Sequence, residues 1–378
     1  MSQSSITLER PAQQVRPRMD WVDRLRVWLT ILVVAHHCAA TYASIQVWYV
    51  NLGTAKDPWS TALTMFLVTN QLWFMGAFFL LSGLFVPGSA DRKGTGRFVR
   101  DRLLRLGIPL LGYVVVVRPI ALLPAAISMA RSTPHFSALR FVLFGGDPGV
   151  TWFLEVLIVF SLGYALIRAI RRTTEALVRQ ERPRFRGLLA LAGVLAVAMF
   201  GWLLVCPMGT YWPVVGLPSP TFLPQYLMLF VVGIVAAKRG WLTSMPGWWA
   251  APAAAGLLAG VACAAATVGS PTSPAHPVTA AVLGLGITLF SLSAIVLLVV
   301  VFRRWLARPA GRFTRFVSQQ AFAVYLTHPI VLVWVAVALL GVPGPAILRF
   351  GLLFVLAVPL CWLAAWALRR IPAVRRII

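Results

Sequence analysis

The sequence predicts an all-α protein, a polytopic transmembrane bundle of about ten helices with both termini in the cytoplasm. Hydrophobic residues make up 59% of the 378 residues and charged residues only 12%, and the mean hydropathy is +0.82. A soluble domain is typically about 45–50% apolar and about 25% charged. Apolar runs of about 20 residues, long enough to cross a hydrocarbon core, recur along the chain. These observations exclude a soluble enzyme and a disordered chain.

The apolar runs divide the chain into a short tail (1–20), a membrane domain (21–370) and a basic tail (371–378). The expected spans are about 27–46, 64–86, 105–125, 152–170, 187–206, 222–237, 248–269, 278–302, 320–341 and 345–368. Between them, the connections 47–63 and 126–151 are long and rich in Trp, Pro and Gly, and we expect a lid or short interfacial helices there. The spans leave no room for a separate soluble domain.

The 34 basic residues decide the orientation. They cluster in alternate connections and in the two tails, and the exceptions are Lys56, Arg118, Arg131, Arg140 and Arg349. This partition follows the positive-inside rule and predicts a multi-pass protein of the cell membrane with both termini inside. The net charge of +24 therefore does not indicate a nucleic-acid partner. The partner that the pattern implies is the lipid bilayer.

The cysteines show no metal-ligand spacing. Cys38, Cys206, Cys263 and Cys361 stand singly in apolar segments, without a CxxC pair or a His/Cys cluster. We therefore expect no metal site and interpret these cysteines as small core residues.

A polar pair marks the first span. Arg26 and His37 are separated by about three helical turns, so their side chains share a face, with an offset of about 20° and a rise of about 16 Å. A histidine inside a span is costly and is usually functional or paired. The alternatives are a snorkelling anchor for Arg26 and a packed histidine for His37. His36 points elsewhere on the helix, and we expect it to have no role.

A second polar group lies at the cytoplasmic side of the second and third spans. Ser82 lies near the end of the second span without the GxSxG pattern of a nucleophile elbow. Arg97, Arg102 and Arg105 lead into the third span, and the last two form an i, i+3 pair on one helix face. Such guanidinium groups can hold phosphates in bidentate fashion. A plain positive-inside cluster is the alternative.

Two more spans carry polar residues. Glu155, just after Trp152, is the acidic residue inside an apolar span, and it is either an ion-pair partner of Arg118 or a substrate ligand. Tyr325 and His328 share a face of the ninth span. Helix packing beside a proline kink is the alternative for that pair.

Taken together, these stretches resemble the acyltransferase-3 family of integral-membrane acyltransferases over residues 20 to 368. No single stretch is specific, but their order and spacing are. The matching stretches are Arg26 with His37, Phe79-Leu80-Leu81-Ser82-Gly83, Arg102-Leu103-Leu104-Arg105 followed by Ile108-Pro109, Trp152-Phe153-Leu154, and Tyr325-Leu326-Thr327-His328-Pro329.

The resemblance implies an O-acyltransferase that moves an acyl group from cytoplasmic acyl-CoA to a hydroxyl, commonly on a sugar, glycolipid, exopolysaccharide or macrolide. It also implies that Arg26 and His37 form the key functional pair and that Arg102 and Arg105 are needed. Relatives often carry a histidine before the Trp-Phe-Leu stretch, where this chain has Val150-Thr151. No hydrolase-like domain follows the last span, so we expect a two-stage transfer to need a partner protein.

The residue chemistry suits this activity. Arg26, Arg102 and Arg105 can meet the phosphates of coenzyme A, with Arg97 and Ser82 beside them. His37 can act as general base toward the acceptor hydroxyl, or can form an acyl-histidine. His328 or Tyr325 can polarise the thioester carbonyl or position the acceptor. For the acceptor, a hydroxyl compound and most simply a carbohydrate, the expected ligands are Glu155, Trp152 and Arg118.

Two other classes of function compete. A transporter or exporter of a polar or lipid-linked substrate would line a pathway with the same buried charges, but the chain shows neither inverted repeats nor an acidic residue near mid-membrane. A structural or sensory membrane protein leaves the register of Arg26 and His37 unexplained.

The charge partition yields a test of topology. A reporter active only outside should be active when fused at Pro218, and one active only inside should be active when fused at Gln319, because basic connections stay in the cytoplasm. The reverse pattern of reporter activity would contradict the orientation.

Overall fold

The structure, a computed structural model, describes residues 19–144, 148–171, 181–213 and 215–378. These residues form helices and connections with no strand, apart from one isolated bridge between Trp212 and Leu217. The helices in chain order are α1 (Asp20–Tyr42), α2 (Pro58–Gln71), α3 (Phe74–Lys93), α4 (Thr95–Arg102), α5 (Ile108–Gly112), α6 (Arg118–Ser132), α7 (Ala138–Phe144), α8 (Trp152–Ile170), α9 (Phe185–Val205), α10 (Leu223–Arg239), α11 (Trp241–Ser244), α12 (Ala250–Ala265), α13 (Pro277–Trp305), α14 (Arg312–Ala338), α15 (Ala346–Leu368) and α16 (Pro372–Arg375).

Among the described residues, 10 helical segments are long and apolar enough to cross a membrane, which confirms the all-α class and the predicted number of spans. The first span begins at Asp20, earlier than expected, so Arg26 lies within α1. The second span is broken at Leu72 and Trp73 into α2 and α3. Of the tail expected over 1–20, residues 1–18 lie outside the described residues. The connection 126–151 contains the end of α6 and the short helix α7, and its residues 145–147 lie outside the description.

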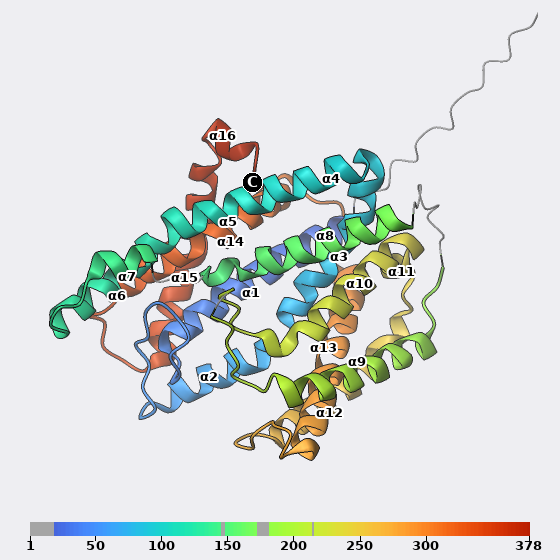
Figure 1. The fold of residues 1–378 in the computed structure, drawn as a ribbon, viewed down its shortest axis with the longest axis horizontal. Helices are drawn as coiled ribbons and strands as arrows, with labels where there is room; N and C mark the ends of the chain where they lie inside the picture. The colour runs from blue at the N-terminus through green and yellow to red at the C-terminus, as the bar shows by residue number, and fades with distance from the viewer. Residues whose placement is uncertain (1–18, 145–147, 172–180, 214) are drawn as a thin grey trace, which may run out of the picture.

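Helices α4, α5 and α6 form one long rod interrupted by two π-helical turns (Figure 1). The turns, Leu103–Gly107 and Tyr113–Val117, each come just before a proline, Pro109 and Pro119. A proline inside a helix donates no backbone hydrogen bond and clashes with the carbonyl four residues earlier. A wider π-helical turn accommodates this and is common at functional sites. The rod therefore continues past both prolines and keeps Arg102, Arg105 and Arg118 on a single element.

Helix α1 lies in the middle of the bundle, between two apolar cores (Figure 1). Leu25, Leu29 and Val33 pack into the larger core, with side chains of α3, α8, α10 and α13. Val34 and Cys38 pack into the smaller core, with α2, α14 and α15. A helix that is apolar toward two sides belongs in the interior of a bundle. The remaining face of α1 is free to carry polar residues.

Glycines allow the closest helix contacts. A Cβ at Gly83 of α3 would lie 2.1 Å from the carbonyl oxygen of Phe230, and a Cβ at Gly233 of α10 would lie 2.1 Å from that of Leu80. Small residues let membrane helices approach to backbone contact. In the same way, a Cβ at Gly260 of α12 would lie 2.6 Å from the Phe290 nitrogen of α13, so these two helices also pack closely.

The basic connections meet at one end of the bundle. A guanidinium nitrogen of Arg24 donates to the Arg308 carbonyl at 2.5 Å, and Asp20 accepts from the Ala310 nitrogen at 3.0 Å. Arg303 donates to carbonyls of the α11 segment and Arg369 to that of Gln319. We call this the arginine-rich end. The side of the membrane on which it lies stays a prediction.

The contact between α3 and α10 can be tested through Gly83. Gly83→Ala should lower the free energy of unfolding by about 1–3 kcal/mol, because the added methyl group must displace the Phe230 backbone. The measurement is the thermal midpoint of the protein in detergent. Gly163→Ala on α8, where a Cβ meets nothing within 4 Å, is the control and should leave the midpoint unchanged or slightly raised. Equal midpoints for both variants would contradict the close approach.

Candidate functional site

A cavity of about 1220 Å³ runs through the bundle from the arginine-rich end to the loops at the opposite end. Its walls come from α1, α3, α8 and α14, the α4–α6 rod and the loops after α1 and α9. Arg26, Arg102 and Arg105 line one end. At the other end are residues of the loop segments 45–49, 208–211 and 216–222. A site reached from both ends can take two different substrates.

One face of α1 lines the cavity along its length. Arg26, Thr30, Val33, His37 and Ala40 all reach it, so the predicted shared face of Arg26 and His37 is confirmed. The Arg26 guanidinium donates to Asp23 at 2.8 Å and to the Ser318 hydroxyl at 3.0 Å. Its charge is therefore partly neutralised by its own helix.

The hydrogen bonds of His37 determine which ring nitrogen carries its proton. Nδ1 lies 3.0 Å from the Val33 carbonyl oxygen and 3.1 Å from Nε2 of His328, whose own Nδ1 lies 2.8 Å from the Tyr325 carbonyl oxygen. A carbonyl oxygen only accepts, so each Nδ1 must carry a hydrogen. Nε2 of His328 then accepts from His37. Nε2 of His37 is left with a free lone pair, in a side chain that lines the cavity.

The structure corrects the expected role of His328. Its side chain is completely buried behind His37 and is not part of the cavity lining, so it does not reach a substrate carbonyl. The Trp48 indole packs against the His37 ring at a centroid distance of 4.1 Å. The His328 ring packs against the His37 ring at 4.9 Å. These two rings hold the imidazole of His37 in place. Helical periodicity gives no signal for Trp48, because this residue lies in a loop.

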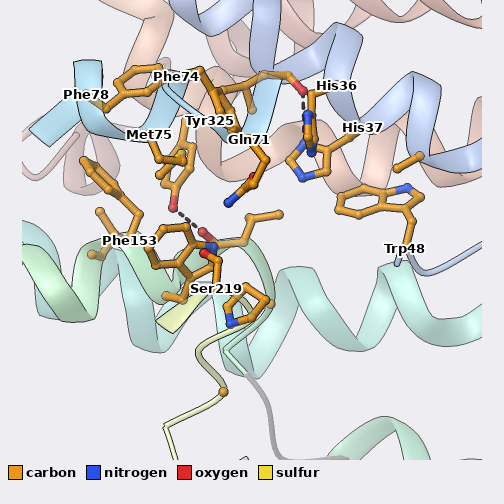
Figure 2. Close-up of a pocket in the computed structure, with 18 of the residues that line it drawn as sticks. His36, His37, Trp48, Gln71, Phe74, Met75, Phe78, Phe153, Ser219 and Tyr325 are labelled. Atoms are coloured by element: carbon orange, nitrogen blue, oxygen red, sulfur yellow. Dashed lines mark hydrogen bonds between the residues drawn. The ribbon is translucent and has the colours of Figure 1, made fainter. Parts of the chain in front are cut away.

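His36 also lines the cavity, although its position on the helix predicted that it points elsewhere (Figure 2). Its Nδ1 lies 3.1 Å from the side-chain nitrogen of Asn70, and its ring stacks on Phe74 at a centroid distance of 5.0 Å. Adjacent residues on a helix point about 100° apart, but a cavity this wide receives both. Only the packing of α2 and α3 against α1 brings Asn70 and Phe74 to His36.

Arg102 and Arg105 of the rod bring positive charge to the cavity. Arg102 and Arg105 both line the cavity, as expected from their shared face, and so does Ser82. Among the described residues, no carboxylate forms an ion pair with either arginine, since the nearby Asp101 is bound by Lys93. Arg97 is exposed and outside the cavity lining, contrary to expectation. Unpaired guanidinium groups at a cavity mouth favour a phosphate-bearing ligand.

The residues expected for the acceptor divide into two groups. Trp152 and Arg118 line the cavity, and Arg118 is only 5% exposed, with a guanidinium nitrogen 3.5 Å from the Val142 carbonyl oxygen. Glu155 is half-buried on α8 and is not part of the lining, so the structure does not support it as a substrate ligand. Tyr325 lines the cavity, and its hydroxyl donates to the Val150 carbonyl (Figure 2).

The middle of the cavity is apolar and aromatic. Figure 2 shows Phe74, Met75, Phe78 and Phe153 on one side of the two imidazole rings and Trp48 on the other. Within the described residues, no three His, Cys, Asp or Glu side chains gather as metal ligands. The arrangement can hold an anionic group at the arginines and a linear apolar group beside two imidazole rings.

Comparisons with known proteins agree with this geometry. The model of the acyltransferase-3 family, described as an acyltransferase domain, matches residues 19–366. Glucans biosynthesis protein C of Salmonella paratyphi B, Salmonella heidelberg and Salmonella enteritidis is similar to this chain, with 34% identity over 95 residues. The match covers 25% of this chain and 23% of each relative. No solved structure matches the chain significantly.

The family match covers nearly the whole described chain, including α1, the rod and α14, which supply most of the polar cavity lining. The ten long apolar helical segments among the described residues are those of a multi-pass membrane protein. The protein therefore belongs to the acyltransferase-3 family.

Proposed function

We propose that the protein transfers an acyl group from cytoplasmic acyl-CoA to a hydroxyl of a carbohydrate or glycolipid acceptor, and that it resides in the cell membrane. The observation that carries the proposal is the free Nε2 lone pair of His37 on the wall of a cavity whose mouth holds two unpaired arginines. A base beside an anion site is what transfer from a phosphate-bearing thioester to a hydroxyl requires.

The donor enters at the arginine-rich end, which faces the cytoplasm in the predicted orientation. Arg102 and Arg105 bind its phosphates, because their charges have no carboxylate partner among the described residues. Arg26, tied to Asp23 and Ser318, orients the donor rather than supplying most of the charge. The rise from Arg26 to His37 is about 16 Å along α1, a length that a pantetheine arm spans. The thioester then lies at His37.

The acyl transfer follows from the hydrogen bonds of His37. Nε2 takes the proton of the acceptor hydroxyl as its oxygen attacks the thioester carbonyl carbon. The C–O bond forms, the C–S bond breaks, and the departing thiolate of coenzyme A takes the proton back from Nε2. The Val33 carbonyl and Nε2 of His328 accept from Nδ1 throughout, so they stabilise the transient imidazolium and keep Nε2 toward the cavity.

The acceptor end of the cavity suits a sugar. Trp48, Tyr49 and Tyr211 provide aromatic faces with polar edges, and Thr210 and Ser219 provide hydroxyls. Such side chains combine an apolar face with hydrogen-bonding groups, as a sugar ring requires. The name of the partial relatives refers to glucan biosynthesis, which supports a carbohydrate acceptor. Because the chain matches only 23% of the length of those relatives, their name does not identify the acceptor.

The direct test uses purified protein in lipid nanodiscs with acetyl-CoA and a set of oligosaccharides. We expect free coenzyme A and esterified sugar to appear in equal amounts. A transporter, the alternative that also uses a cavity open to both ends, would release no coenzyme A. Absence of thioester turnover with every acceptor, in protein that binds acetyl-CoA, would overturn the proposal.

The role of Arg102 and Arg105 can be tested by removing their charge and by changing the shape of the charged group. Replacing Arg102 and Arg105 together by alanine should weaken acyl-CoA binding at least tenfold, because each removes a charged hydrogen bond of about 1.5–3 kcal/mol. A double lysine variant should recover only part of the affinity, since lysine lacks the planar fork. Calorimetry measures the acyl-CoA affinity of both double variants.

The matched control removes the same charge from the same connection. Arg92 and Arg100 are exposed and outside the cavity lining, and replacing both by alanine should leave acyl-CoA affinity within about twofold. Equal losses in the two double variants would mean that the general positive field, rather than the pair, attracts the donor.

The role of His37 as base is tested with glutamine. His37→Gln should lower kcat by about 10²–10⁴-fold while acyl-CoA still binds, because glutamine cannot take up the proton. His276→Gln, an exposed histidine at the start of α13, is the control and should keep full activity. Turnover of His37→Gln near the wild-type rate would show that His37 is a packed histidine and no base.

A further inference from the structure

His36 presents a second imidazole to the reaction cavity, directly beside His37. The two rings lie at a centroid distance of 5.2 Å and an interplanar angle of 82°. Both belong to the cavity lining, in the C-terminal half of α1. Neither the family match nor the proposed mechanism uses this ring.

The hydrogen bond from Asn70 determines the tautomer of His36. The nitrogen of the Asn70 amide, 3.1 Å from Nδ1, can only donate, so Nδ1 must accept. A neutral imidazole with a free Nδ1 carries its hydrogen on Nε2. Within the described chain, no group hydrogen-bonds to that Nε2. His36 therefore offers the cavity a donor, whereas His37 offers it an acceptor.

Packing keeps His36 in this orientation. Asn70 is only 4% exposed near the end of α2, and Phe74 at the start of α3 stacks on the imidazole with an interplanar angle of 24°. The break between α2 and α3 places Phe74 against a face of the ring and Asn70 at its Nδ1 edge. A ring stacked on one side and hydrogen-bonded on another cannot turn over without losing both contacts.

We propose that His36 is a catalytic residue that binds the thioester carbonyl oxygen through Nε2–H, and that Asn70 is its positioning residue. The inference rests on the proposed acyl transfer. When the acceptor oxygen attacks, the carbonyl π electrons move onto that oxygen, and the donor on Nε2 stabilises the resulting oxyanion. When the C–S bond breaks, the electrons return to the carbonyl, so His36 keeps its proton. His36 thus acts as the hydrogen-bond donor to the oxyanion, and His37 acts as the general base.

Two substitutions of His36 distinguish the hydrogen-bond donor at Nε2 from the imidazole ring itself. The amide nitrogen of glutamine extends about as far as Nε2 of histidine, whereas that of asparagine reaches only to Nδ1. His36→Asn should therefore lower kcat by about 10²–10³-fold, the effect of removing one oxyanion donor. His36→Gln should lose less than about tenfold. Both should bind acetyl-CoA as the wild type does, which serves as the check on folding.

A double-mutant cycle tests Asn70 through the tautomer. Asn70→Asp replaces the donor by a carboxylate, which draws the His36 hydrogen to Nδ1 and leaves a lone pair at Nε2. It should lower kcat with little change in KM for acetyl-CoA. In the His36→Gln background the same change should have little further effect, because no imidazole remains to switch. A merely structural role of Asn70 would cost the same in both backgrounds.

The outcomes separate this inference from the proposed function. If His36→Asn turns over like the wild type while His37→Gln is inactive, His36 is no oxyanion donor and the acyltransferase proposal stands. An effect of Asn70→Asp that is equal in both backgrounds overturns the positioning role. If the wild-type protein itself releases no coenzyme A, the proposed function fails first.

Discussion

The structure depends on one constraint, the burial of a polar helix face inside an apolar bundle. Helix α1 packs against two apolar cores and carries two histidines and an arginine on the face that remains. Polar groups in a membrane interior must find partners or line a cavity. Here α14 supplies His328 to His37, and α2 supplies Asn70 to His36. The other helices surround this arrangement, held close by glycines at the α3–α10 and α12–α13 contacts.

Charge is distributed along the cavity in an order that suits transfer from an anionic donor. Unpaired guanidinium groups lie at one mouth, neutral imidazoles in the apolar middle, and aromatic side chains with hydroxyls at the other mouth. Arginines at a wet boundary keep their charge at little cost, whereas the same charge in the middle would need a partner. Electrostatic stabilisation of an oxyanion is strongest in a site that excludes water. The anion site on the rod and the reaction site on α1 therefore lie at different depths of one cavity.

Local geometry explains which site residues were predictable. Arg26 and His37 share a face because helix periodicity is the same in any environment, and Arg102 and Arg105 do so for the same reason. Trp48 lies in a loop, so no periodicity pointed to it. His328 was recognised as polar and near Tyr325, but whether it faced the cavity or lay behind His37 depended on how α14 packs against α1. The same uncertainty misplaced Arg97 and Glu155, which share helices with cavity residues but point away from the cavity.

The sequence by itself determined the ten apolar helices found among the described residues and the alternate connections that carry the basic residues, because hydropathy and charge act residue by residue. It also determined that α1 carries a polar face. Tertiary structure decided what that face touches. The tautomers of His36 and His37 depend on Asn70 from α2, on His328 from α14, and on the Val33 carbonyl. Hydrogen-bond partners from distant segments are a product of helix packing, and hydropathy carries no information about them.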